Sequence, residues 1–104
     1  MRLEVAQLQG LDKITARVST FLAPIGQPVR FGTLVITARA CRKRPPTETP
    51  ESVAFLEIDD RKPGQDQVVL FKGWMFASSP ALNALEHPVY DVWVLDCESA
   101  PAKQ

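Results

Sequence analysis

The feature that most constrains this chain is a period-two alternation of apolar and polar residues, cut into short runs by nine prolines. Successive side chains of a strand point to opposite faces, so alternation at every second residue is typical of a half-buried β-strand. Proline ends helices and is excluded from central strands, because its nitrogen has no hydrogen to donate. The sequence therefore predicts short strands joined by many turns, without long helices.

Six or seven short strands are predicted, depending on whether an N-terminal run is counted; the runs cover 3–8, 14–19, 29–31, 34–41, 52–59, 68–76 and 89–97. Strands at this spacing are typical of an antiparallel β-sandwich, which we favour, or of a small β-barrel. The runs 52–59 and 68–76 are separated by a Pro-Gly turn and are predicted to form a hairpin. The fold class is therefore expected to be all-β.

Alternation also predicts which residues share a face. Ile14, Ala16 and Val18 are predicted to lie on one buried face of their strand, and Gly32 predicts a bulge or a break in the run that contains it. In the run 34–41, Leu34, Ile36, Ala38 and Ala40 are predicted to lie on one face and Val35, Thr37, Arg39 and Cys41 on the other.

Three segments are not expected to form strands. Residues 42–51 hold three prolines within six positions and are predicted to be a loop. Ser79 can cap a helix and Pro80 suits its first position, so one short helix is predicted near residues 80–86, ended by the proline that follows His87. Residues 99–104 are predicted to be a frayed tail.

The chain length favours a single domain, because 104 residues can bury one hydrophobic core but little apolar surface beyond it. Twelve basic and twelve acidic residues cancel, so no global field attracts nucleic acid. No run approaches the roughly 18 apolar residues of a transmembrane helix. The first residues show no basic head and apolar run of an export signal, so the chain is either cytoplasmic or begins after a removed signal peptide.

Cys41 and Cys97 are the two cysteines, and each ends a predicted strand. A disulfide between them is possible if the two strands are neighbours or face each other, and closing a loop of this length would be worth roughly 4 kcal/mol. The alternative is two buried free thiols, which are common in cores. A disulfide would imply an oxidising compartment and therefore export.

Catalytic and metal sites find little support in the sequence. His87 is the single histidine, with Ser78, Ser79 and Asp91 nearby, but no glycine-flanked serine elbow is present. A structural role for His87 is therefore favoured, as a hydrogen-bond partner of backbone groups. One histidine and two distant cysteines give no zinc-type spacing, and Asp59, Asp60 and Asp66 lack the pattern of a calcium loop. No metal or cofactor is expected.

The strongest charge cluster is basic and lies next to the loop 42–51. Arg39, Arg42, Lys43 and Arg44 can meet an acidic partner, a phosphate or a lipid head group, or form a charged edge that Glu48 and Glu51 partly neutralise. The aromatic residues of the closing segment either fill the core or line an interface; they are Trp74, Phe76, Tyr90 and Trp93.

The chain resembles a bacterial family, domain of unknown function number 2155, met largely in alphaproteobacteria. The matching segments are residues 11–17, 31–34, 40–46, 73–82 and 84–93, of which Gly-Trp-Met-Phe-Ala-Ser-Ser-Pro-Ala-Leu at 73–82 is the most specific. The resemblance covers roughly residues 3–98. It implies an exported protein and so favours a periplasmic Cys41–Cys97 disulfide, but it supplies no catalytic residue, cofactor or substrate.

We therefore expect a non-enzymatic binding or structural module of the cell envelope, periplasmic rather than cytoplasmic, with a protein partner and no nucleic-acid partner. The candidate binding residues are Arg39, Arg42, Lys43, Arg44, Trp74, Phe76, His87 and Tyr90. The second hypothesis is a β-sandwich that binds a small ligand or carbohydrate through its aromatics. The third is a hydrolase that uses Ser79 and His87.

Overall fold

The computed structural model describes residues 3–80, 85 and 87–99, and every regular element in them is a β-strand. The strands are β1 (Val5–Asp12), β2 (Arg17–Pro24), β3 (Pro28–Phe31), β4 (Leu34–Lys43), β5 (Ser52–Asp60), β6 (Val68–Phe76) and β7 (Tyr90–Glu98). All paired strands run antiparallel. The predicted all-β class is confirmed, and so is the hairpin of β5 and β6.

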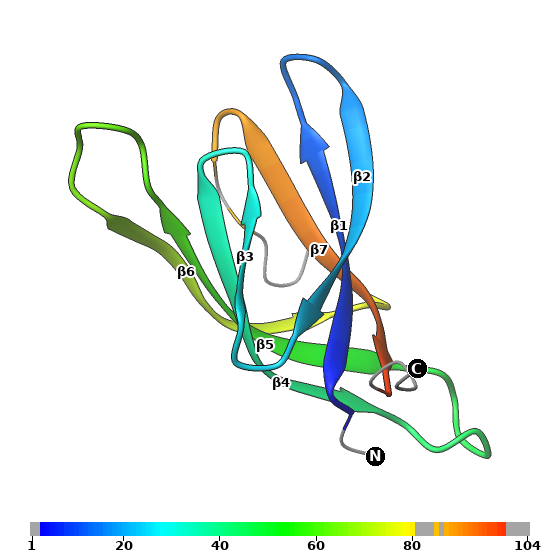
Figure 1. Cartoon of the computed structure of the whole chain (residues 1–104). Coiled ribbons are helices and arrows are strands. Elements are labelled where there is room, and N and C mark those ends of the chain that lie inside the picture. The colour runs from blue at the N-terminus through cyan, green and yellow to red at the C-terminus, as the bar shows by residue number, and fades with distance from the viewer. Residues whose placement is uncertain (1–2, 81–84, 86, 100–104) are drawn as a thin grey trace, which may run out of the picture.

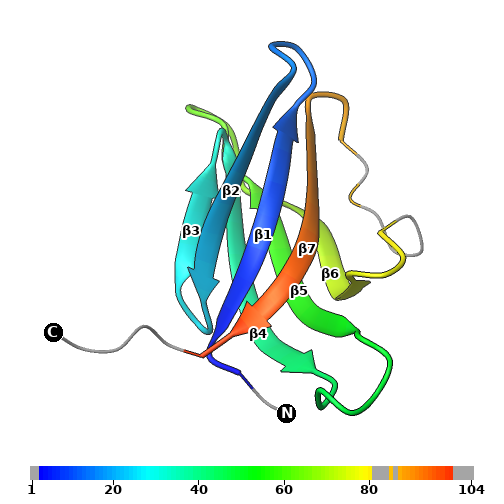
Figure 2. The same ribbon diagram turned by 90° about the vertical axis from the view of Figure 1, so that its right-hand side faces the viewer.

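The strands form two sheets, one of three strands in the order β2-β1-β7 and one of four in the order β3-β4-β5-β6. Figure 2 looks onto the three-stranded sheet, with the four-stranded sheet behind it, and Figure 1 shows the pair from the side. The chain passes from the first sheet to the second in the turn at residues 25–27 and returns after β6. In the described residues the two sheets do not close into a barrel, so that alternative is wrong.

One apolar core lies between the sheets, because alternate residues of each strand point inward. β5 shows this most regularly: its even-numbered residues from Ser52 to Asp60 are buried and its odd-numbered residues are half-exposed. The largest fully buried apolar side chains come from five strands and are Leu8, Leu34, Ile36, Leu56, Ile58, Met75, Val92 and Val94.

Two β-bulges turn the cysteines into this core. In β4 the pairing with β5 skips Arg39, and in β7 the pairing with β1 skips Leu95. A bulge adds one residue to a strand, so the residues beyond it change faces. Ala38 and Cys41 are therefore both buried although three positions separate them. Simple alternation placed Cys41 on the face opposite Ala38, and the bulge overturns that prediction.

An aromatic ladder joins the two sheets at the end away from the cysteines. The rings of Phe21 and Phe31 stack with centroids 5.6 Å apart, and Tyr90 meets Phe31 edge-on at 5.5 Å. Gly32 lies in the β3–β4 turn with φ of 61°, and a Cβ there would collide with the Tyr90 ring. The predicted break at Gly32 is confirmed, because β3 ends at Phe31 and β4 begins at Leu34.

The prediction for residues 14–19 is wrong in its first half. Residues 13–16 form the β1–β2 turn, in which the amides of Ile14 and Thr15 donate to the Asp12 carboxylate at 2.9 and 3.2 Å. An aspartate that caps its own turn competes with strand pairing. As a result, Ile14 is 76% exposed rather than buried, and Ala16 takes a φ of 59°. Val18 does lie on β2 but is 55% exposed, so the predicted buried face is wrong there too.

The predictions for the loop 42–51, the helix near 80–86 and the tail 99–104 have different outcomes. β4 continues through Lys43, so the proline-rich loop spans 44–51 and Arg42 and Lys43 belong to a strand. In the predicted helix near 80–86, residues 81–84 and 86 lie outside the described residues, and Pro80 and Leu85 are not helical. Of the tail 99–104, only Ser99 is described. In the described part of the chain, no helix has the length and apolarity to cross a membrane.

Candidate functional site

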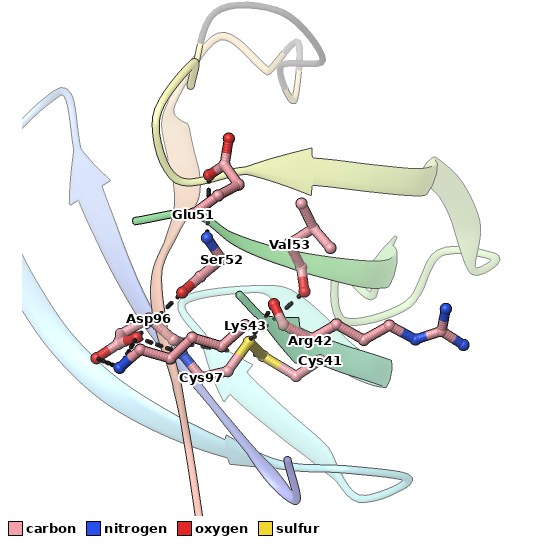
Figure 3. Close-up of a disulfide and its surroundings, with 8 residues drawn as sticks. All are labelled: Cys41, Arg42, Lys43, Glu51, Ser52, Val53, Asp96 and Cys97. Carbon is pink, nitrogen blue, oxygen red and sulfur yellow. Dashed lines mark hydrogen bonds and ion pairs between the residues drawn. A yellow bond between two sulfur atoms is a disulfide. The ribbon is translucent and has the colours of Figure 1, made fainter. Parts of the chain in front are cut away.

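Cys41 and Cys97 mark one end of the sheet pair, which we call the disulfide end. Their sulfur atoms are 1.95 Å apart, at disulfide distance, and their Cα atoms are 5.7 Å apart. Both residues are buried, at 0% and 1% exposure. The pair joins β4 of one sheet to β7 of the other across the core, as Figure 3 shows. It therefore clamps the two sheets together where the loop 44–51 begins and ends.

Asp96 is the hub of the polar contacts around this pair (Figure 3). Its carboxylate accepts from the Ser52 hydroxyl at 3.1 Å and from the Cys97 amide at 2.8 Å, and it forms an ion pair with Lys43 at 3.1 Å. Burial alone would raise the pKa of Asp96, but these partners outweigh it and hold the pKa below its usual value. Asp96 therefore links β4, β5 and β7 as a carboxylate.

Glu51 closes the loop 44–51 in a similar way. Its carboxylate accepts hydrogen bonds from the hydroxyl and amide of Ser78, the latter at 3.1 Å, and from the amide of Ser52 at 3.0 Å. The Ser78 hydroxyl bond is the main cause that lowers the pKa of Glu51. Ser78 thus fastens the turn after β6 to the start of β5.

Three hollows surround Lys43 and Glu51 at this end of the molecule. The first, of about 480 Å³, lies under the loop and includes Leu3, Pro45 and Pro46 in its lining. The second, of about 310 Å³, opens between basic and apolar side chains; it is lined by Arg42, Lys43, Arg44, Pro45, Glu51, Val53 and Phe76. The third, of about 380 Å³, adjoins Ser78 and Asp96. Hollows of this size fit small ligands or single side chains of a partner.

The basic residues predicted as a site are adjacent but differently engaged. Arg39 pairs with Glu57 at 3.2 Å, and Lys43 pairs with Asp96. The Arg42 guanidinium lies 5.7 Å from the centre of the Trp74 ring, within the range of a cation–π contact. Arg44 begins the loop, where its amide donates to the Glu51 carbonyl at 3.0 Å. The carboxylates of Glu57 and Asp96 therefore offset part of the cluster's charge.

The outer face of the four-stranded sheet carries a band that we call the basic–aromatic strip: Arg42, Val53, Phe55, Trp74 and Phe76. Register places Arg42, Val53 and Phe76 in one row across β4, β5 and β6, and Phe55 beside Trp74 in the next row. Phe55 and Trp74 meet edge-on at 5.4 Å. The four apolar members are half-exposed, although side chains of this size would be buried in a core.

Val53 and Phe55 were not among the predicted site residues, yet a signal for them exists. In the run 52–59, alternation places them on the face opposite Ala54 and Leu56, and Trp74 and Phe76 share one face of their strand by the same rule. Which strands are neighbours was the missing information, because a single sequence does not give the strand order.

His87 and Tyr90 lie at the opposite end, which we call the histidine end, so the structure does not bring them to the strip. His87 is 8% exposed, and its Nε2 lies 3.0 Å from the Asp60 carboxylate. Its Nδ1 accepts from the amides of Val89 and Tyr90 at 3.0 and 3.2 Å. The Tyr90 ring packs on Phe31 and His87. As predicted, His87 hydrogen-bonds backbone, and it orders the start of β7.

A serine–histidine pair would need a free imidazole nitrogen, since the base must accept the proton of the nucleophile. Both ring nitrogens of His87 are engaged, one with Asp60 and one with backbone amides. Ser79 uses its own amide to close the turn after Phe76. Among residues 3–80, 85 and 87–99, no three side chains of His, Cys, Asp or Glu gather in a way that could hold a metal ion.

Comparisons with known proteins place this chain in a family. The chain is 32% identical over 87 residues to an uncharacterized protein of Rickettsia prowazekii (strain Madrid E). That alignment covers 84% of this chain but 56% of the relative, so the chain spans little more than half of the relative's length. No solved structure matches the chain. The family model described as "Uncharacterized protein conserved in bacteria (DUF2155)" matches residues 6–97, and the chain belongs to this family.

Proposed function

We propose that this protein is a non-enzymatic binding module of the bacterial cell envelope, and that its basic–aromatic strip captures an acidic and apolar segment of a partner protein. The module resides in the periplasm rather than the cytoplasm, with the Cys41–Cys97 bond holding its two sheets. The observation that carries the proposal is the strip itself: its apolar side chains are half-exposed, and the Arg42 guanidinium lies over the Trp74 ring.

The chemistry of the partner follows from the hollow beside the strip. Three cationic side chains and one carboxylate line it, and Val53 and Phe76 form its apolar wall. Arg42 presents a planar guanidinium that a carboxylate can meet with two hydrogen bonds, while the Trp74 ring supports it from beneath. A partner segment with a carboxylate next to an aromatic or aliphatic residue therefore matches both the charge and the apolar surface.

The compartment is supported by the chemistry of the cysteine pair. Two cysteines at disulfide distance stay bonded in oxidising compartments and are kept reduced in the cytosol. The buried Cys41 and Cys97 have no exposed sulfur to take part in thiol exchange, which suits a structural bond rather than a catalytic one.

A small-ligand site is the second candidate, and the hollow of about 480 Å³ under the loop 44–51 favours it. Stacking of a sugar on Trp74 has less support, because Arg42 already lies over that ring. A fluorescence titration with glycans and lipids separates the two candidates. Quenching of tryptophan fluorescence by a small ligand supports the small-ligand site. An unchanged fluorescence across the panel counts against that site and favours a protein partner.

The proposal is tested by photo-crosslinking from the strip. A benzoylphenylalanine residue replaces Phe76 in one variant and Val69 in another; Val69 is 63% exposed and lies at the other end of β6. Both are expressed in the bacterium's own envelope, irradiated, and analysed by mass spectrometry. We expect one dominant protein adduct from position 76 that position 69 does not give.

The charge requirement is tested in the same assay. Arg42→Ala is expected to reduce the adduct at position 76 by tenfold or more, about 1.4 kcal/mol of binding. Arg30→Ala, which removes an exposed arginine from β3 at the far edge of the sheet, is the matched control and should leave the yield unchanged. No adduct at position 76, or equal adducts from positions 76 and 69, would overturn the proposal.

A further inference from the structure

The hollow of about 310 Å³ beside the strip, which we call the arginine hollow, contains positive charge that the described residues do not neutralise. Arg42 and Arg44 line it, and neither forms an ion pair within the part of the chain that the structure describes. Lys43, the third cation of the lining, is paired with Asp96 at 3.1 Å. Arg42 lies over the Trp74 ring, a contact that holds the guanidinium but leaves its charge in place. Two arginines are therefore available to an anion.

The single carboxylate of the lining does not use up this charge. Glu51 accepts hydrogen bonds from the hydroxyl and amide of Ser78 and from the amide of Ser52. The Ser78 hydroxyl is the main cause that lowers the pKa of Glu51, and the charge of Arg44 contributes least. Glu51 is therefore a fixed carboxylate in the wall of the hollow. It disfavours an occupant that brings two carboxylates, because like charges repel.

The apolar wall of the arginine hollow lies directly beside Arg42. Strand register pairs Arg42 with Val53 and Val53 with Phe76, so the three residues form one row across β4, β5 and β6. Cβ atoms of directly paired residues in antiparallel strands are about 5 Å apart. The volume of about 310 Å³ is at the lower end of the range for ligand sites. An occupant must therefore present one carboxylate and one apolar group close together.

A residue in the middle of an extended segment meets this requirement poorly. Successive side chains point to opposite faces, so an acidic residue and its apolar neighbour do not both enter one hollow. Two residues that share a face are about 6.6 Å apart along the strand, and both would have to fit. The last residue of a chain, in contrast, carries its carboxylate and its side chain on a single Cα. That carboxylate is ionised at neutral pH and can accept two hydrogen bonds from one guanidinium.

We propose that the arginine hollow binds the C-terminal residue of the partner protein, with its α-carboxylate on Arg42 and Arg44 and its apolar side chain on Val53 and Phe76. The inference rests on the proposed function and names the part of the partner that the strip captures. Capture of a chain end through its carboxylate is a recurring mode of peptide recognition.

Three short peptides test the requirement for a chain end. The probes are acetyl-glycyl-glycyl-phenylalanine as the free acid, the same peptide as its C-terminal amide, and acetyl-glycyl-aspartyl-phenylalanyl-glycine amide, which carries its carboxylate inside the chain. In nitrogen–proton correlation spectra of the full chain, the free acid is expected to shift the Trp74 indole signal with a dissociation constant of about 1 mM. The signal of Trp93, which lies in the other sheet, should stay. The other two peptides should bind at least about tenfold more weakly.

A matched pair of variants assigns the carboxylate contact. Arg44→Ala is expected to weaken binding of the free acid by about tenfold or more, since one of its two cationic partners is gone. Arg44 is exposed at the start of the loop, and the hydrogen bond of its backbone amide to Glu51 does not need the side chain. Arg30→Ala removes an exposed arginine of β3 and should leave the affinity unchanged.

The photo-crosslink at position 76 tests the inference on the natural partner. The adduct is digested, and the attached partner peptide is sequenced by mass spectrometry. We expect the peptide that contains the last residue of the partner. An internal partner peptide, or equal affinity for the free acid and either of the other two peptides, would overturn the inference and leave the proposed function standing. Absence of any adduct would overturn both, so the two failures are distinguishable.

Discussion

Asp60 and Asp96 stabilise opposite ends of the molecule as carboxylates. Burial alone would raise both pKa values from 3.8, but hydrogen bonds from Thr33 and His87 lower that of Asp60, and bonds from Lys43, Cys97 and Ser52 lower that of Asp96. A carboxyl group whose folded pKa lies below its unfolded value stabilises the fold above the unfolded value. That stability is lost as the pH falls from the unfolded pKa through the folded pKa.

The free energy of unfolding is therefore expected to fall as the pH is lowered from about 5 through 4 and below. Asp60→Asn and Asp96→Asn should each be less stable than the wild type at pH 7 and should each flatten this acid-side slope, because the titrating group is gone. Asp66→Asn, in the exposed β5–β6 turn, is the control and should keep the wild-type slope. Urea unfolding at a series of pH values measures all four proteins, and unchanged slopes for Asp60→Asn and Asp96→Asn would refute the assignment.

Gly32 and Gly64 allow a matched test of the contact at Tyr90. Both have positive φ, at 61° and 74°, but a Cβ at Gly32 meets the Tyr90 ring, whereas a Cβ at Gly64 meets nothing within 4 Å. Gly64→Ala is expected to cost about 1 kcal/mol through its backbone, and Gly32→Ala about 1–3 kcal/mol more through overpacking. Thermal or urea unfolding checks the difference, and equal losses would contradict the contact.

At the scale of elements, the two bulges decide where the cysteines point. Arg39 and Leu95 resemble ordinary strand residues, so no local signal in the sequence marks them as unpaired. The strands, the Pro-Gly hairpin and the break at Gly32 were predictable, because turn residues and alternation are local. The register shifts were not, because each depends on how a neighbouring strand is paired.

Inserting one alanine directly after Leu95 is expected to prevent the Cys41–Cys97 bond, since a second extra residue in β7 would turn the residues after it to the other face. Inserting one alanine after Thr47 in the exposed loop 44–51 lengthens the chain equally and should leave the bond intact. Alkylation under denaturing conditions, followed by mass spectrometry, counts the free thiols in each variant. An insertion after Leu95 that folds with both cysteines bonded would show that the strand register does not set their direction.

At the scale of the whole molecule, the cysteine pair is a cross-link between the two sheets. It connects residues 56 apart in the chain, so breaking it restores considerable freedom to the unfolded state. Replacing both cysteines with serine is expected to cost about 4 kcal/mol. In a domain of this size that corresponds to a fall of roughly 15–30 °C in melting temperature, measured by calorimetry. A change of a few degrees would mean that the core alone holds the sheets.

The candidate site shows the same division between local and long-range information. The adjacent residues Arg42, Lys43 and Arg44 were found because they form a charge cluster in the sequence, and the structure gathers them with Trp74 and Phe76. His87 and Tyr90 share the closing segment with Trp74 but lie at the other end of the molecule, and the chain returns to the three-stranded sheet between Trp74 and Tyr90. Nearness in sequence could not reveal that separation.

The central claim, an envelope module clamped by a disulfide, is tested most directly by the thiol state in living cells. Cells are quenched in acid, denatured, and treated with a thiol-reactive polyethylene glycol before and after reduction. The account predicts no added mass before reduction and two additions after it, since the chain has two cysteines. Two additions before reduction would place the chain in a reducing compartment and contradict the claim.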